Sequence, residues 1–221
     1  MLLYRFRPFN EHTKDELLTE KLHFSHPSTW NDPFEAIRHN RSIGLDVDGG
    51  SRYVCFSIGS NRNKKMLQNI LMWSHYADSH KGICVEYECE YTLIGDIHRN
   101  SVSYQIKYEN QKTAYSPSVL SFFGKGEDIF KSNKAKCWNY ENEYRIQTRM
   151  HHTNTNFKGI NIPYSEIGLK IKAIYCGVKF EESQIETLKL IKGKRDFEIF
   201  TGKVENYTSI KFTNTGAVER T

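Results

Sequence analysis

The stretch LMWSHYADSHKG, residues 71–82, runs directly into the strand-like segment GICVEYE at 82–88. Apolar residues before and within it recur at helical spacing: Met66, Ile70, Trp73 and Ala77. This spacing predicts a mostly buried helix over about 63–79, which Gly82 ends by supplying a left-handed cap. A helix that gives way at once to an aromatic, β-branched strand indicates a fold that mixes α and β elements.

Strand-like segments lie on both sides of this helix. Those rich in aromatic and β-branched residues are 2–7, 21–26, 53–59, 82–88, 101–109, 143–149, 158–164, 169–178 and 197–200. Further helices are predicted at about 12–20, 117–131 and 181–192. No boundary or repeat divides the chain, so we predict a single α+β domain over 1–203, with a mainly antiparallel sheet and peripheral helices. Residues 204–221 are expected to form a poorly ordered or peripheral tail.

The composition argues against a membrane-spanning protein, a secreted protein and a protein held by disulfides. The chain has 221 residues, of which 38% are hydrophobic, and it contains no apolar run of the roughly 18 residues that a membrane span needs. Its N-terminus lacks the apolar core of a signal peptide, and its five cysteines include no CxxC pair. We therefore expect a cytoplasmic protein with free thiols and no membrane partner. A net charge of +5 is compatible with an anionic ligand such as a nucleotide. Nucleic acid stays open as a partner, but the sequence has no dense stripe of lysine and arginine that would indicate nucleic-acid binding.

The two histidines of the 71–82 stretch have two interpretations. His75 and His80 are five residues apart, whereas two zinc ligands on one helical face need a spacing of four, so no metal is expected. On a helix, Trp73, Tyr76 and His80 would share one face. They are either the satisfied end of a buried helix or a surface that faces a ligand.

The stretch WNDPFE, residues 30–35, also has two interpretations. Asp32 can cap a helix, Pro33 suits its first position, and Glu35 occupies the acidic position of a capping box. A helix that starts here would also present backbone N–H groups to a phosphate, with Asn31 at the mouth of the pocket. Asn31 and Asp32 are therefore candidate ligand-binding residues.

The stretch KAKCWNYENEYRI, residues 134–146, carries the candidate catalytic carboxylates. If residues 141–145 are extended, alternation places Glu141, Glu143 and Arg145 on one face. This face is either a solvent-exposed charge ladder or a pair of carboxylates that holds ribose hydroxyls and stabilises an oxocarbenium-like transition state. Lys134 and Arg145 are candidate ligand-binding residues beside them.

The order of these motifs resembles that of a widespread bacterial family of domains of unknown function. The resemblance covers about residues 2–200 and rests on FSHPSTWNDPFE (24–35), MWSHYADSHKGICVEY (72–87) and the tryptophan and Glu-x-Glu pattern of 134–146.

A second resemblance implies chemistry. ADP-ribosyltransferases of the arginine–serine–glutamate type carry an arginine on the first strand, a serine on a middle strand and a Glu-x-Glu on a later one. Arg5, Ser57 and the pair Glu141 and Glu143 occur here in that order. The resemblance implies that Arg5 holds a phosphate or ribose of NAD and that Ser57 braces the site. It also implies that Glu143 stabilises the oxocarbenium ion and that Glu141 orients the acceptor. In such a site Trp73, His75 or Tyr76 would line the pocket, and Arg7 would compete with Arg5.

This resemblance implies a split-sheet fold like that of the ADP-ribosyltransferases, with NAD as substrate and an unidentified macromolecular acceptor. The expected activity is ADP-ribosyl transfer or NAD glycohydrolysis, and the kind of family suggests an effector in bacterial conflict or phage defence. Two other classes stay open. One is a nuclease-like or glycosidase-like hydrolase that uses His75 and His80 with Glu143, and the other is a non-catalytic module that binds a nucleotide or a protein.

Overall fold

The computed structural model describes residues 1–26, 29–30, 51–59, 65–90, 95–96, 101–110, 133–149, 159–193 and 195–216. The chain divides into two compact units, each assembled from separate stretches of sequence. The first unit comprises Met1–Leu22, Phe56–Thr92 and Pro163–Thr221, and the second comprises His23–Cys55 and Leu93–Ile162. The sequence offers no boundary between them, because no single linker separates them.

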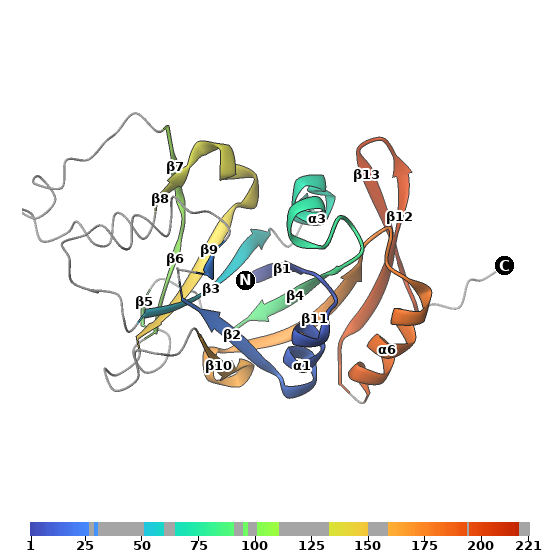
Figure 1. Ribbon diagram of the computed structural model, residues 1–221, viewed down its shortest axis with the longest axis horizontal. Helices are drawn as coiled ribbons and strands as arrows, with labels where there is room; N and C mark the ends of the chain where they lie inside the picture. The colour runs from blue at the N-terminus through green and yellow to red at the C-terminus, as the bar shows by residue number, and fades with distance from the viewer. Residues whose placement is uncertain are drawn as a thin grey trace, which may run out of the picture. The chain divides into compact units, whose positions relative to one another are not determined.

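The first unit contains a mostly antiparallel sheet in the order β13-β12-β11-β4-β1-β3 (Figure 1). Its strands are β1 (Leu2–Arg7), β3 (Ser51–Gly59, of which the C-terminal half belongs to this unit), β4 (Ile83–Cys89), β11 (Leu169–Cys176), β12 (Glu198–Asn206) and β13 (Ser209–Asn214). Among the described strand pairs of this unit, only the neighbours β11 and β12 are parallel, and helix α6 (Glu182–Lys192) connects them. A parallel pair needs such a crossover, whereas antiparallel neighbours do not.

Helices cover both faces of this sheet. The helical elements of the unit are α1 (Glu11–Thr19), the 3₁₀ turn η2 (Lys65–Gln68), α3 (Ile70–Tyr76), the 3₁₀ turn η4 (Tyr164–Ile167) and α6. Helix α1 begins at the Asn10 cap, whose side chain accepts a hydrogen bond from the Thr13 backbone N–H. On the opposite face, the buried ring of Trp73 from α3 packs edge-on against Phe6, with ring centres 5.0 Å apart. No helix in the described ranges is long and apolar enough to cross a membrane.

The second unit contains the strand order β3-β9-β6-β5, and β2 pairs with both β3 and β10. These strands are β2 (Lys21–Ser25), β5 (Gly95–Asp96), β6 (Ser101–Gln105), β9 (Glu143–Arg149) and β10 (Gly159–Pro163). Strands β7 (Lys107–Glu109) and β8 (Asn133–Ala135) form a separate parallel pair, and the 3₁₀ helix η3 (Lys136–Glu141) leads from β8 to β9.

The prediction of a fold that mixes α and β elements, with a mainly antiparallel sheet, is confirmed. The bounds predicted for the strands at 2–7 and 143–149 are those of β1 and β9. The single helix predicted over 63–79 is wrong, because Asn69 lies between η2 and α3 and caps the latter, which ends at Tyr76.

Two other predictions concern the rest of the chain. The helix predicted at 117–131 lies outside the described residues. Residues 204–216, which the sequence assigns to a poorly ordered or peripheral tail, contain the end of β12 and the whole of β13, a strand at the edge of the sheet.

Candidate functional site

A left-handed residue in the second unit brings the two candidate catalytic carboxylates together. The condition that residues 141–145 are extended is not met, because η3 continues to Glu141 and Asn142 has a φ of 44°. Asparagine tolerates this conformation better than most residues. Strand β9 then starts at Glu143. The two carboxylates therefore converge through a helix end and a strand start, not through strand alternation.

One ammonium group joins both carboxylates. Lys134 Nζ lies 2.6 Å from Glu141 Oε2 and 3.1 Å from Glu143 Oε2. On the other side of Glu143, Arg145 Nε donates to Oε1 at 2.5 Å. These four residues, which we call the carboxylate cluster, each expose 5% or less of their surface. The solvent-exposed charge ladder considered for this stretch is therefore wrong.

The charge state of Glu143 follows from its neighbours. Burial alone would raise the pKa of its carboxyl, but Arg145 and Lys134 outweigh this and lower the pKa to about 2. A hydrogen bond from Cys55 acts in the same direction. The Glu143 backbone N–H donates to the Tyr108 hydroxyl at 2.7 Å, which fixes the start of the strand beside the cluster. Glu143 is thus a buried carboxylate that stays ionised at neutral pH.

Two tryptophan rings cover the two cations of the carboxylate cluster. The Arg145 guanidinium lies 4.5 Å from the centre of the Trp30 ring, and Lys134 Nζ lies 4.8 Å from that of Trp138. Both rings are partly exposed to solvent. We did not predict a site role for either residue from the sequence. Trp138 stands within the 134–146 motif and could have been included, whereas the placement of Trp30 depends on a long-range contact.

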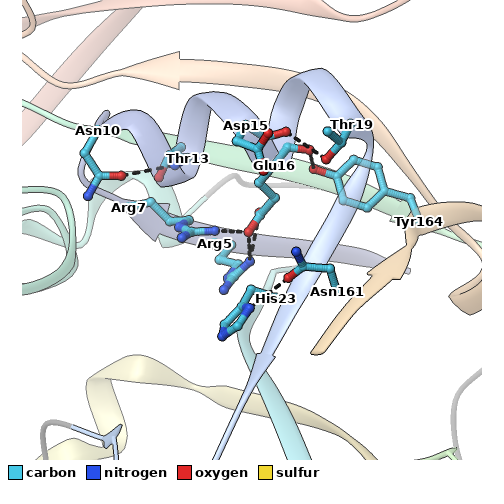
Figure 2. A network of polar contacts seen from close by, with 10 residues as sticks. All are labelled: Arg5, Arg7, Asn10, Thr13, Asp15, Glu16, Thr19, His23, Asn161 and Tyr164. Atoms are coloured by element: carbon cyan, nitrogen blue, oxygen red, sulfur yellow. Dashed lines mark hydrogen bonds and ion pairs between the residues drawn. The ribbon is translucent and has the colours of Figure 1, made fainter. Parts of the chain in front are cut away.

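The first unit has a second charged cluster, formed between β1 and α1. Arg5 Nη1 donates to both oxygens of the Glu16 carboxylate, at 2.9 and 3.1 Å, and Arg7 Nη1 also donates to Oε2 (Figure 2). The Tyr164 hydroxyl donates to the Glu16 backbone oxygen at 3.2 Å. We call Arg5, Arg7 and Glu16 the arginine cluster. Figure 2 also shows a separate contact within the second unit, in which His23 Nδ1 lies 2.8 Å from Asn161 Oδ1.

The structure does not bring Arg5 and Ser57 together. In the antiparallel register Ser57 is paired with Tyr4, and directly paired residues point to the same face of a sheet. Arg5 follows Tyr4 on the strand, so its side chain points to the other face. The shared pocket that the resemblance implies for Arg5 and Ser57 is therefore wrong. Ser57 is buried on the face of Tyr4 and Glu86.

The end of the 71–82 stretch is a tight left-handed turn. Asp78, Ser79 and His80 have φ values of 46°, 52° and 71°. Their run is held by backbone hydrogen bonds, including His80 N–H to the Trp73 carbonyl and Gly82 N–H to the Ala77 carbonyl. The turn returns the chain from α3 into β4.

The aromatic residues of this stretch do not share one helical face, because α3 ends before His80. Trp73 is fully buried, His75 is exposed, and Tyr76 is partly exposed. His80 Nε2 lies 3.1 Å from Ser74 Oγ, and its ring stacks on Trp73. Burial, and then the charge of Lys179, lower the pKa of His80, which favours its neutral form.

The structure does not describe the candidate ligand-binding residues of the WNDPFE stretch, and the described residues offer no metal site. Asn31 and Asp32 lie outside the described residues. Within the described ranges, no group of three or more His, Cys, Asp or Glu side chains could hold a metal ion.

Comparison with known proteins finds similarity to a family of unknown function over part of the chain. The model of a family described as a protein of unknown function (DUF2971) matches residues 72–146. This confirms the predicted resemblance to a family of domains of unknown function, over a segment that includes the left-handed turn at residues 78–80 and all four residues of the carboxylate cluster. No curated protein and no solved structure matches the chain.

Proposed function

We propose that the protein cleaves the N-glycosidic bond of NAD and passes ADP-ribose to an acceptor or to water. The observation that carries the proposal is the carboxylate cluster, in which Glu143 is ionised and Glu141 is held beside it by the same ammonium group. The split-sheet fold of ADP-ribosyltransferases is part of the proposal. A role in bacterial conflict is an expectation that follows from it.

The proposed reaction uses the two carboxylates in different roles. The bond between the ribose C1′ and the nicotinamide nitrogen breaks, and its electron pair leaves with nicotinamide. The positive charge that develops at C1′ is stabilised by the Glu143 carboxylate. The acceptor oxygen or nitrogen then attacks C1′, and its proton passes to Glu141 as general base.

The aromatic and cationic neighbours have supporting roles in this proposal. The partly exposed ring of Trp30 can stack on a planar base, and Arg145 beneath it can attract a phosphate. Lys134 fixes the separation of the carboxylates before substrate binds. Arg5 and Ser57 have no part in the proposed chemistry, since it uses residues of the second unit alone.

The test is nicotinamide release from NAD by the wild type and by Glu143→Gln, with and without a bacterial lysate as a source of acceptors. The substitution keeps the shape of the side chain and removes its charge, so we expect release to fall by at least about a hundredfold. Glu186→Gln is a matched control, because Glu186 is exposed and pairs only with Lys189 among described residues. Full activity of a folded Glu143→Gln protein contradicts the mechanism.

A non-catalytic nucleotide-binding module is the second candidate. It is favoured by the charge balance of the carboxylate cluster, in which Lys134 and Arg145 offset Glu141 and Glu143. Such a network can serve to hold a binding surface rather than to react. Calorimetric binding of NAD without release of nicotinamide supports this candidate over the enzyme.

A further inference from the structure

Two guanidinium groups share one carboxylate on the face of the first unit's sheet that α1 covers. Arg5 and Arg7 are alternate residues of β1, so both point to this face. Glu16 of α1 accepts hydrogen bonds from both (Figure 2). Because arginine stays protonated and the pKa of the Glu16 carboxyl is lowered by both arginines against the effect of burial, the arginine cluster carries a net charge of +1 at neutral pH.

The two arginines of the cluster are more exposed to solvent than the carboxylate that they share. The Glu16 side chain is 5% exposed, whereas those of Arg5 and Arg7 are 16% and 17% exposed. Among the described residues, the Arg7 guanidinium donates hydrogen bonds only to Glu16. One Nη1 atom serves that bond, and a guanidinium carries five N–H donors in all. Arg7 therefore has donors that an incoming anion can use while its bond to Glu16 persists.

The two arginines also repel each other. The pKa of Arg7 is lowered first by burial and then by the charge of Arg5, and Glu16 offsets this only in part. An anion that binds both guanidinium groups would remove this repulsion. Tyr87 lies on the same face, since it is paired with Leu3, two residues before Arg5. Its buried hydroxyl interacts with the side chain of Tyr164 and with the charges of Glu16, Arg5 and Arg7.

We propose that Arg5 and Arg7 form an oxyanion site in the first unit, which takes a phosphate group and which Glu16 keeps preorganised when no ligand is bound. The planar N–H fork of arginine matches the oxygens of a phosphate, and a phosphate carries enough charge to compete with a single carboxylate. The site goes beyond the proposed NAD chemistry and does not depend on it. In this site Arg5 and Arg7 bind the ligand together, so Arg7 does not compete with Arg5.

Substitution of Glu16 distinguishes a phosphate site from a purely structural clamp, because only a phosphate site predicts a gain in phosphate affinity. If the cluster is only a structural clamp, removal of the Glu16 charge weakens the fold and creates no affinity for phosphate. If the cluster binds an oxyanion, Glu16 competes with the ligand for the same donors. Glu16→Gln should then bind phosphate more tightly than the wild type, by about fourfold or more, even though its fold is less stable.

The experiment measures binding of inorganic phosphate at 25 °C by isothermal titration calorimetry, with sodium chloride adjusted to hold the ionic strength constant. AMP forms a second arm, because tighter binding of AMP than of phosphate indicates a nucleotide as the source of the phosphate group. The variants are Glu16→Gln, Arg7→Met, and Arg195→Met as the matched control. Arg195 is an arginine of the same unit that pairs with Glu20 and with the carbonyls of Leu18 and Ile191.

We expect the wild type to bind phosphate, Glu16→Gln to bind it more tightly, Arg7→Met to lose at least about tenfold in affinity, and Arg195→Met to match the wild type. Absence of phosphate binding by the wild type overturns the proposal. So does weaker binding by Glu16→Gln, or an equal loss in Arg7→Met and Arg195→Met. If Arg7→Met does not fold, the comparison of Glu16→Gln with the wild type still decides.

Discussion

The carboxylate cluster and the arginine cluster are built from the same kinds of side chain but differ in balance and exposure. In the second unit, Lys134 and Arg145 face two carboxylates, and all four residues are at most 5% exposed. In the first unit, Arg5 and Arg7 face one carboxylate among the residues that the structure describes, and both arginines remain partly open to solvent. Counted over these described side chains alone, the first arrangement is neutral and the second carries one surplus positive charge.

The difference follows from the free-energy cost of removing charge from water. A fully buried ion is tolerated only when an opposite charge and hydrogen bonds replace its hydration, so the buried cluster has as many cations as carboxylates. A surplus cation can persist where solvent still reaches the guanidinium groups. Exposure and charge balance therefore separate a buried cluster of two cations and two carboxylates, which the proposed reaction uses through its carboxylates, from a partly exposed cluster of two cations and one carboxylate.

Among the substitutions in the carboxylate cluster, Lys134→Met should have the largest effect on stability. Removal of the ammonium leaves two buried carboxylates with one remaining cation, and loss of one partner from a buried network costs about 3–5 kcal/mol. We expect the free energy of unfolding in urea to fall by this amount. Lys189→Met, which removes an exposed lysine paired with Glu186, should change it by less than about 0.5 kcal/mol. Equal effects of the two substitutions contradict the assignment of Lys134 to a buried network.

The sequence predicted the elements that depend on local pattern. Strands β1 and β9 match their expected bounds because alternating aromatic and β-branched residues specify a strand within a few residues. Glu141 and Glu143 were predicted as a functional pair, and the structure does bring their carboxylates to one ammonium. Their pairing was predicted for the wrong reason, since Glu141 belongs to η3.

The features that the sequence did not predict depend on long-range contacts or on rare backbone conformations. Trp30 reaches Arg145 across more than a hundred residues of sequence, and no periodicity reports such a contact. The turn at Asp78, Ser79 and His80 combines three positive φ values in non-glycine residues. No glycine marks these positions in the sequence, so the helical spacing of the apolar residues does not indicate where the helix ends. The opposite directions of Arg5 and Ser57 depend on strand register, which motif order does not contain.

Acid titration measures how much the ionised Glu143 carboxylate stabilises the fold, and the expected effect is smaller than that of Lys134→Met. The pKa of Glu143 falls from its usual 4.5 to about 2 on folding, so its ionised form stabilises the protein above about pH 4.5. This stabilisation is lost as the pH falls from about 4.5 through 2, because the folded state must then take up a proton that the unfolded state already holds. We expect a loss on the order of 2 kcal/mol in this interval, measured as urea unfolding at successive pH values.

Glu143→Gln supplies the comparison for the titration. It should be less stable than the wild type at pH 7, and the difference should shrink as the pH approaches 2, since glutamine has no proton to gain. Two stability curves that stay parallel over this interval contradict a lowered pKa for Glu143 in the folded protein.

Trp30 tests the edge of the carboxylate cluster, where the expected effect is smallest. Its ring covers the Arg145 guanidinium, and a cation–π contact with a buried cation contributes about 1 kcal/mol. Trp30→Leu alone would also remove the hydrogen bond from the indole nitrogen to Ser25 and contacts with Tyr53, so the single variant overstates the interaction. A double-mutant cycle with Arg145→Met isolates it, and we expect a coupling energy of about 1 kcal/mol in urea unfolding. A coupling energy near zero means that the ring only covers the cluster without stabilising its charge, and Arg145 is then held by Glu143 rather than by Trp30.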